Sequence, residues 1–283
     1  MTAAHASETG PLGPVFLYLL ECYTPSMNEH DFVVGAVREA GELLMRLRIE
    51  HFETLSKGKD PRDIVTSVDL AVNKLLIEKI KDAFPHDAIY SEEGGGDVLA
   101  APRLWTIDPI DGSSNFSRGI PHFSICLALL EAGIPMTGAV YNPVTNELFS
   151  FKRGGGAFLN GAPVRVSEVG ELKDAFVLLH AGRKKELQEW GGQAYTELLK
   201  HAKKTSNLAG SALDMCFVAA GRIEADIYGT ASLLDIAAAV GILHEAGGVI
   251  VGADGAELPL VAEPALMIAA NSRSIADAVR VLL

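Results

Sequence analysis

The stretch WTIDPIDGSSNF, residues 105–116, places two aspartates, Asp108 and Asp111, three positions apart after an apolar run. A buried carboxylate without a partner costs free energy, so Asp108 at the end of LWTI is difficult to explain as a structural residue. Crowded carboxylates repel one another unless protons or cations neutralise them, and Mg²⁺ prefers oxygen ligands. The stretch therefore predicts a short buried strand that ends in a cation site.

The residues between and after these aspartates predict a phosphate site beside the cations. Pro109 and Ile110 form a stiff spacer that turns the chain, so both carboxylates and the Ile110 carbonyl can point toward neighbouring ions. Gly112 permits close backbone approach, and its amide, with those of Ser113 and Ser114, is expected to form an anion-binding nest or a helix N-terminus. Carboxylates that gather metal next to amides that gather phosphate indicate phosphoryl chemistry.

Composition limits the class of partner. The 283 residues are 48% hydrophobic and 21% charged, which is enough for a sizeable core in one large domain or two intimate subdomains. The chain has 24 Lys and Arg against 36 Asp and Glu, a net charge of -12. This charge argues against a nucleic-acid or anionic-membrane surface, so bound cations are the expected means of handling phosphates.

The cysteines and the N-terminus predict a compartment. Cys22, Cys126 and Cys216 are odd in number, far apart and without a C-x-x-C pair, which argues against a disulfide framework or a zinc ribbon and favours a reducing cytoplasm. The apolar GPVFLYLLECY near the N-terminus is too short to span a membrane, and no Lys or Arg precedes it. We expect residues 1–27 to be a variable extension, with Met27 as a hypothetical translation start.

Hydrophobic periodicity divides the rest of the chain into two halves. Apolar residues at helical spacing predict helices over residues 29–52 and 69–84, joined by a loop or hairpin. Short strands separated by turn signals such as AGIP and NPVTN then predict antiparallel hairpins. Strands and helices alternate after Pro163. We expect an N-terminal α+β subdomain, residues 28–162, with most metal ligands, and a C-terminal α/β subdomain, residues 163–283, that closes a site between them.

Further acidic residues each have an ordinary structural explanation. Asp69 is suited to cap a helix, Glu92 and Glu93 to a solvated turn, and Asp235 to the start of an apolar helix. Taken singly, each explanation is stronger than a functional one.

Taken together, the blocks of sequence around these residues closely resemble the inositol monophosphatase family of Mg²⁺-dependent, lithium-sensitive phosphatases. The blocks are DIVTSVD (63–69), SEE (91–93), DPIDGSSNF (108–116), GSALDMCFVAAGRIEA (210–225) and LLDIAAAVGILHEAGG (233–248). They occur in the family's order from about residue 30 to the end. The resemblance implies a layered α-β-α-β-α sandwich of the inositol monophosphatase and fructose-1,6-bisphosphatase type, and a homodimer.

The resemblance also implies roles for individual residues. The implied metal ligands are Glu92, Asp108, the Ile110 carbonyl, Asp111 and Asp235, which together would hold two or three Mg²⁺ ions. The implied catalytic residues are Asp69 and Ser113, which would orient or deprotonate the attacking water, together with Glu92. The implied substrate contacts are Gly112, Ser113, Ser211, Ala212, Tyr228 and Asp235. Glu93 is expected to support the site without binding metal.

Two departures from the family pattern concern the substrate. Leu234 stands where much of the family has Trp, and Tyr228 stands where inositol-specific members have a glutamate that contacts substrate hydroxyls. SSNF after DPIDG resembles inositol or fructose-bisphosphate phosphatases more than 3',5'-bisphosphate nucleotidases, which commonly have a Lys there. The expected reaction is hydrolysis of a small phosphorylated polyol or sugar by metal-activated water.

The first-choice substrate is myo-inositol monophosphate, with fructose-1,6-bisphosphate, histidinol phosphate and a 3',5'-bisphosphate nucleotide as alternatives. A catalytically silent relative that binds a phosphorylated ligand or a partner protein is the non-enzyme alternative. The intact set argues against it, because a purely binding protein would not need both the metal ligands and the water-activating pair; the set is Asp69, Glu92, Asp108, Asp111, Ser113 and Asp235.

Overall fold

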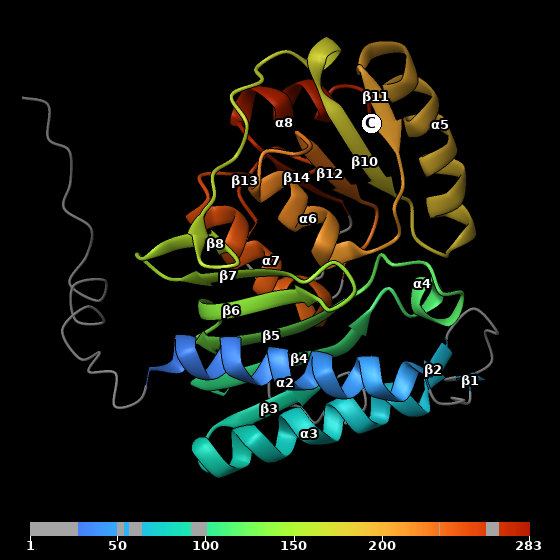
Figure 1. Cartoon of the computed structure of the whole chain (residues 1–283). Coiled ribbons are helices and arrows are strands. Elements are labelled where there is room, and N and C mark those ends of the chain that lie inside the picture. Colours follow the sequence, from blue (N-terminus) through green and yellow to red (C-terminus); the bar gives the residue numbers. More distant parts are fainter. Residues whose placement is uncertain (1–27, 50–53, 57–63, 92–100, 232, 259–265) are drawn as a thin grey trace, which may run out of the picture.

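Five layers of helix and sheet are stacked in the computed structural model of the chain (Figure 1). The structure describes residues 28–49, 54–56, 64–91, 101–231, 233–258 and 266–283, without the side chains of residues 54–56, 64–65 and 233–235. The expected extension at residues 1–27 lies outside this part of the chain. Among the described residues, no helix is both long and apolar enough to cross a membrane.

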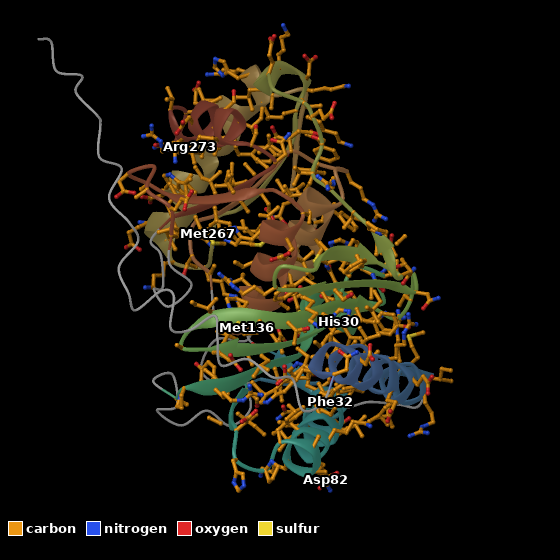
Figure 2. All side chains as sticks on the ribbon, turned by 90° about the vertical axis from the view of Figure 1, so that its left-hand side faces the viewer. His30, Phe32, Asp82, Met136, Met267 and Arg273 are labelled. Carbon is orange, nitrogen blue, oxygen red and sulfur yellow. The ribbon has the colours of Figure 1, made fainter. Side chains whose placement is uncertain are left out.

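The first layer consists of α2 (Glu29–Ile49) and α3 (Ser67–Ala83), the two helices predicted from periodicity. Apolar residues three or four positions apart face the sheet and are buried, Val33, Val37, Ala40 and Leu44 in α2 and Val68, Val72, Leu76 and Ile80 in α3. Phe32 lies between the two helices (Figure 2), and its ring packs edge-on against Phe84 and Trp105. Before α3, the short strands β1 (Thr54–Ser56) and β2 (Ile64–Thr66) pair antiparallel, as a hairpin would.

A seven-stranded sheet forms the second layer. Its strands, in both chain and spatial order, are β3 (Ala88–Ser91), β4 (Arg103–Asp111), β5 (Ser124–Glu131), β6 (Ile134–Asn142), β7 (Glu147–Lys152), β8 (Gly156–Leu159) and β9 (Ala162–Pro163). Among the described strands of this sheet, only β3 and β4 pair parallel, so the antiparallel hairpins predicted from the turn signals are confirmed.

Strand β5 shows why this sheet is an inner layer. Ile125, Leu127 and Leu129 belong to the core shared with α2 and α3. Cys126, Ala128 and Leu130 belong to the core on the other face. Successive side chains of a strand point to opposite faces, so an unbroken apolar run implies burial on both.

The remaining layers come from the second half of the chain. A five-stranded sheet has the order β11 (Lys204–Ser206), β10 (Phe176–His180), β12 (Ala225–Tyr228), β14 (Met267–Ala270) and β13 (Val249–Gly252). Between the two sheets lie α6 (Ser211–Ala219) and α7 (Leu233–Glu245), and the outer face carries α5 (Lys185–His201) and α8 (Arg273–Arg280) (Figure 1). The predicted α-β-α-β-α sandwich is confirmed.

Candidate active site

The paired aspartates lie at an irregularity in β4. Asp108 pairs with Cys126 of β5, whereas Asp111, three residues on, pairs with Ser124, only two residues away. The strand predicted to end at Asp108 therefore continues to Asp111 around one extra residue, as in a β-bulge. Both carboxylates are nevertheless buried, with 3% of Asp108 and 5% of Asp111 exposed.

The extra residue makes the chain between the aspartates fold onto itself. Oδ1 of Asp108 accepts a hydrogen bond from the Ile110 amide at 3.0 Å. The Ile110 carbonyl accepts one from the Ser113 hydroxyl at 2.9 Å. Three of the predicted site residues are thus joined through one peptide segment, with the Ile110 side chain anchored in the core below.

Asp111 is held by the N-terminus of α6. Its Oδ1 accepts from the Ser211 amide at 3.2 Å, and its Oδ2 accepts from the Ala212 amide at 3.0 Å and from the Ser124 hydroxyl at 3.2 Å. Burial raises the pKa of Asp111 to about 6, against the Ala212 hydrogen bond that favours the charged form, and the nearby Asp214 carboxylate adds to the rise. A bound divalent cation would favour the ionised carboxylate.

The turn after Asp111 requires glycine. Gly112 has a φ of 86°, and a Cβ there would lie 3.1 Å from the His122 carbonyl oxygen. The short helix α4 (Ser113–Ser117) follows. Its Asn115 side-chain amide donates to the carbonyls of His122 at 2.7 Å and Leu208 at 3.0 Å, which ties α4 to the segment before α6.

Asp69 is the third residue of α3 and is fully buried. It forms a capping box with Thr66: the carboxylate accepts from the Thr66 amide at 2.8 Å, and the Asp69 amide donates to the Thr66 hydroxyl at 3.3 Å. The strand before this cap, β2, lies against α4, which begins at Ser113. The predicted pairing of Asp69 with Ser113 stays a prediction.

The structure describes the other predicted acidic residues only in part. Glu92 and Glu93 lie outside the described residues. Asp235 is in the first turn of α7, but its side chain is not described. The structure therefore brings together Asp108, Ile110 and Asp111 from the predicted ligand set, and the rest of that set stays a prediction.

Tyr228, a predicted substrate contact, is 1% exposed at the end of β12. Its hydroxyl lies 2.7 Å from the Ser211 carbonyl oxygen and also contacts the Asp226 carboxylate. Two more predicted substrate contacts, Ser211 and Ala212, direct their amides at Asp111. All three residues belong to one hydrogen-bonded connection that ends at the Asp111 carboxylate.

A buried group of charged side chains next to Tyr228 was missed from the sequence. His180 Nε2 lies 3.1 Å from Asp214 Oδ2 and 3.2 Å from Asp226 Oδ1, and His122 Nε2 lies 2.6 Å from Asp214 Oδ1. Burial alone would lower the pKa of His180, but the two carboxylates outweigh it and raise the pKa to about 10. Asp226 within the apolar strand ADIY was the available signal, the same one that identified Asp108.

Sequence comparison finds the same family along nearly the whole chain. The family model described as "Inositol monophosphatase family" matches residues 28–281. A fructose-1,6-bisphosphatase/inositol-1-monophosphatase of Thermotoga maritima is 34% identical over 234 residues, 82% of this chain and 87% of that protein. Nus factor SuhB of Xylella fastidiosa is 34% identical over 83% of this chain and 84% of its own length. Inositol monophosphatase 1 of Solanum lycopersicum is 32% identical over 81% and 86%.

Solved structures agree with the sequence match. The Thermotoga maritima IMPase has a TM-score of 0.82 at 32% identity and covers 90% of this chain and 96% of its own. Inositol monophosphatase from Anabaena has a TM-score of 0.79 at 26% identity, with 92% and 96% covered. The chain therefore belongs to the inositol monophosphatase family, and the resemblance read from its sequence blocks is confirmed.

Proposed function

We propose that this protein is a Mg²⁺-dependent phosphomonoesterase that hydrolyses a small phosphorylated polyol or sugar. One observation carries the proposal: two carboxylates, Asp108 and Asp111, are buried together at the bulge of β4 in a chain of this family. Burial of two acids in one short segment is costly unless protons or cations neutralise them. Carboxylate and carbonyl oxygens in this segment are the donors that Mg²⁺ prefers, so the residues fit the ion.

Five residues would hold two or three ions: Glu92, Asp108, Asp111 and Asp235 by their carboxylates and Ile110 by its carbonyl. When bound, Mg²⁺ activates water and stabilises the leaving oxygen of a phosphate ester. The Ser113 hydroxyl, 2.9 Å from the Ile110 carbonyl, lies next to this ligand set. No nucleophilic side chain is required.

Protein groups would place the other reactants. Asp69, fixed by its capping box with Thr66, and Ser113 would orient or deprotonate the attacking water, assisted by Glu92. The backbone of Gly112 and Ser113, which the missing side chain of Gly112 leaves open to close approach, would bind the phosphate. These roles follow the pattern of the family at matching positions.

The first-choice substrate is myo-inositol monophosphate. Relatives named inositol monophosphatase, and one named fructose-1,6-bisphosphatase/inositol-1-monophosphatase, support a phosphorylated polyol or sugar. Fructose-1,6-bisphosphate is the main rival, followed by histidinol phosphate and a 3',5'-bisphosphate nucleotide. Tyr228 in place of the glutamate of inositol-specific members is the reason for testing all four.

The test is phosphate release from these four substrates with Mg²⁺, with and without Li⁺. Asp111→Asn is expected to lower kcat/KM by at least about 100-fold, because it removes charge from a metal ligand. Asp174→Asn is the matched control, since Asp174 is an exposed residue of the 3-10 turn Leu172–Asp174, in the other half of the chain. Near wild-type rates in Asp111→Asn would contradict the assignment.

The non-enzyme alternative is a silent relative that binds a phosphorylated ligand or a partner protein. This alternative is tested because some relatives are named Nus factor SuhB, a name that states no phosphatase activity. Calorimetry separates the two functions, because a phosphatase of this type must bind Mg²⁺ in the millimolar range. Absence of Mg²⁺ binding there, together with no phosphate release, would favour the silent relative.

We also propose that the protein is a lithium-sensitive, cytoplasmic homodimer. Its mass in solution, measured by light scattering, is then expected to be twice the 30.0 kDa of one chain. A mass equal to that of one chain would contradict the homodimer.

A further inference from the structure

Helix α6 begins without a side-chain cap. Its N-cap residue is Gly210, and the first free amides of the helix, those of Ser211 and Ala212, donate to the Asp111 carboxylate. The orientation of this carboxylate therefore depends on the position of the first turn of α6. Whatever fixes that turn also fixes the proposed metal ligand.

One peptide group connects Tyr228 to Asp111. The Ser211 carbonyl and the Ala212 amide belong to the same planar peptide unit, whose oxygen and hydrogen point in opposite directions. The oxygen lies 2.7 Å from the Tyr228 hydroxyl, and the nitrogen lies 3.0 Å from Asp111 Oδ2. A hydrogen bond at the carbonyl polarises the peptide and strengthens the amide as a donor.

The Tyr228 hydroxyl is itself held in place. The ring is buried and stacks on His180, with centroids 5.0 Å apart and planes at 11°. Asp226 precedes Tyr228 by two positions on β12, so its side chain is on the same face, and its carboxylate contacts the hydroxyl. His180 lies opposite Tyr228 on the neighbouring strand β10.

The same charged group also reaches α6 directly. Asp214 in its first turn lies 3.1 Å from His180 and 2.6 Å from His122. The His122 carbonyl in turn accepts the Asn115 amide of α4 at 2.7 Å. Two imidazoles thus face two buried carboxylates, and the start of α6 is held from β10, from β12 and from the loop after α4.

We propose that Tyr228 is a positioning residue, whose hydroxyl fixes the Ser211–Ala212 peptide and thereby the Asp111 carboxylate that binds metal. The inference rests on the proposed function and gives Tyr228 a task other than the substrate contact implied by the family resemblance. Asp226 and His180 support this task by holding the Tyr228 side chain.

The test compares Tyr228→Phe with Tyr195→Phe. Both substitutions remove a hydroxyl that bonds to a backbone carbonyl, since Tyr195 donates to the Thr205 carbonyl at 3.0 Å, away from the β4 bulge. In Tyr228→Phe, the Mg²⁺ concentration for half-maximal phosphate release is expected to rise about 10-fold, with KM for substrate at saturating Mg²⁺ nearly unchanged. Tyr195→Phe is expected to change neither quantity.

Hydrogen exchange without metal gives a second readout that does not depend on activity. The Ser211 and Ala212 amides are expected to exchange about 10 times faster in Tyr228→Phe than in the wild type, because the peptide loses its anchor. Asp226→Asn is the second variant, since the Asp226 carboxylate and the Ser211 carbonyl share the single proton of the Tyr228 hydroxyl. It leaves that proton to the Ser211 carbonyl, so neither readout is expected to move as it does in Tyr228→Phe.

Two results would overturn the inference while the proposed function stands. One is a wild-type enzyme with Mg²⁺-dependent activity whose Mg²⁺ requirement and amide exchange are unchanged in Tyr228→Phe. The other is a rise in KM for substrate alone, which would make Tyr228 a substrate contact. An inactive wild-type protein would instead overturn the proposed function.

Discussion

Gly241 of α7 and Phe151 of β7 meet so closely that a Cβ on Gly241 would lie 2.1 Å from Cζ of the ring. Both residues are in the core between the two sheets, where Phe151 is 1% exposed. At this point the helix that carries Asp235 therefore contacts the larger sheet through bare backbone.

Gly241→Ala is expected to destabilise the protein by about 2 kcal/mol, because the added methyl overpacks this contact. Gly192→Ala is the matched control: Gly192 is also inside a helix, α5, but a Cβ there meets nothing within 4 Å. Its expected effect is a gain of roughly 0.5–1 kcal/mol from helix propensity. Urea unfolding measures both, and equal effects of the two substitutions would refute the packing argument.

Arg103 joins three elements through three carboxylates. It pairs with Glu29 of α2 at 2.7 Å, with Asp87 before β3 at 3.0 Å, and with Glu131 of β5. Arg103→Met is expected to lower the free energy of unfolding by about 2 kcal/mol, a value reduced for the partial exposure of the side chain. Lys74→Met, which removes an exposed pair with Glu78, is expected to change almost nothing. If Arg103→Met lowered the free energy of unfolding only slightly, the three carboxylates would be well solvated without the guanidinium.

Thr66 is expected to affect both stability and catalysis. Thr66→Ala removes the hydroxyl half of the α3 capping box and is expected to cost about 1 kcal/mol. Because Asp69 then loses a partner, the phosphatase rate is expected to fall as well. Thr66→Ser keeps the hydroxyl and is expected to retain both, as measured by urea unfolding and phosphate release. Full activity in Thr66→Ala would argue against a role of Asp69 in the reaction.

His180 predicts a pH-dependent contribution to stability. Its pKa is raised from 6.5 to about 10 because two carboxylates outweigh the effect of burial. A raised pKa stabilises the fold fully below the unfolded value, and this contribution is lost as the pH rises through the folded value. The difference in unfolding free energy between the wild type and His180→Gln is thus expected to be largest near pH 6 and to shrink toward pH 10. A difference that grows with pH would contradict the ion pairs.

Two cysteines are expected to be unreactive in the native protein. Cys126 and Cys216 are buried, and burial together with the nearby Asp111 carboxylate raises the pKa of both thiols. The thiolate is the reactive form, so alkylation by iodoacetamide should be slow until the protein unfolds. Peptide mass spectrometry with and without urea measures this. Rapid native labelling of either residue would show that the core opens locally.

Local sequence signals were enough to predict most of the fold. The apolar spacing of α2 and α3, the unbroken apolar run of β5 and the turn signals between strands each depend on residues close together in the chain. Strands β9 and β11 were missed because they are only two and three residues long, and β13 was missed although its VIVG is as long and as apolar as β14. Their pairing partners define them.

Part of the candidate site could likewise be predicted from the local sequence, and part could not. Asp108 and Asp111 could be found because a carboxylate after an apolar run is unusual wherever it occurs. The bulge between them could not be found, because it depends on how β4 pairs with β5. Nor could the contact of His180 with Asp226 be found, because strand order alone brings β10 beside β12.

The order of the strands also has a consequence for synthesis on the ribosome. In the larger sheet every strand pairs with its neighbour in sequence, so this layer can form while the rest of the chain is still being translated. Asp108 and Asp111 are then already adjacent, but the amides of Ser211 and Ala212 that hold Asp111 emerge much later. One apolar face of this sheet stays uncovered until α6 and α7 follow, and metal affinity is expected to arise only when α6 has been made.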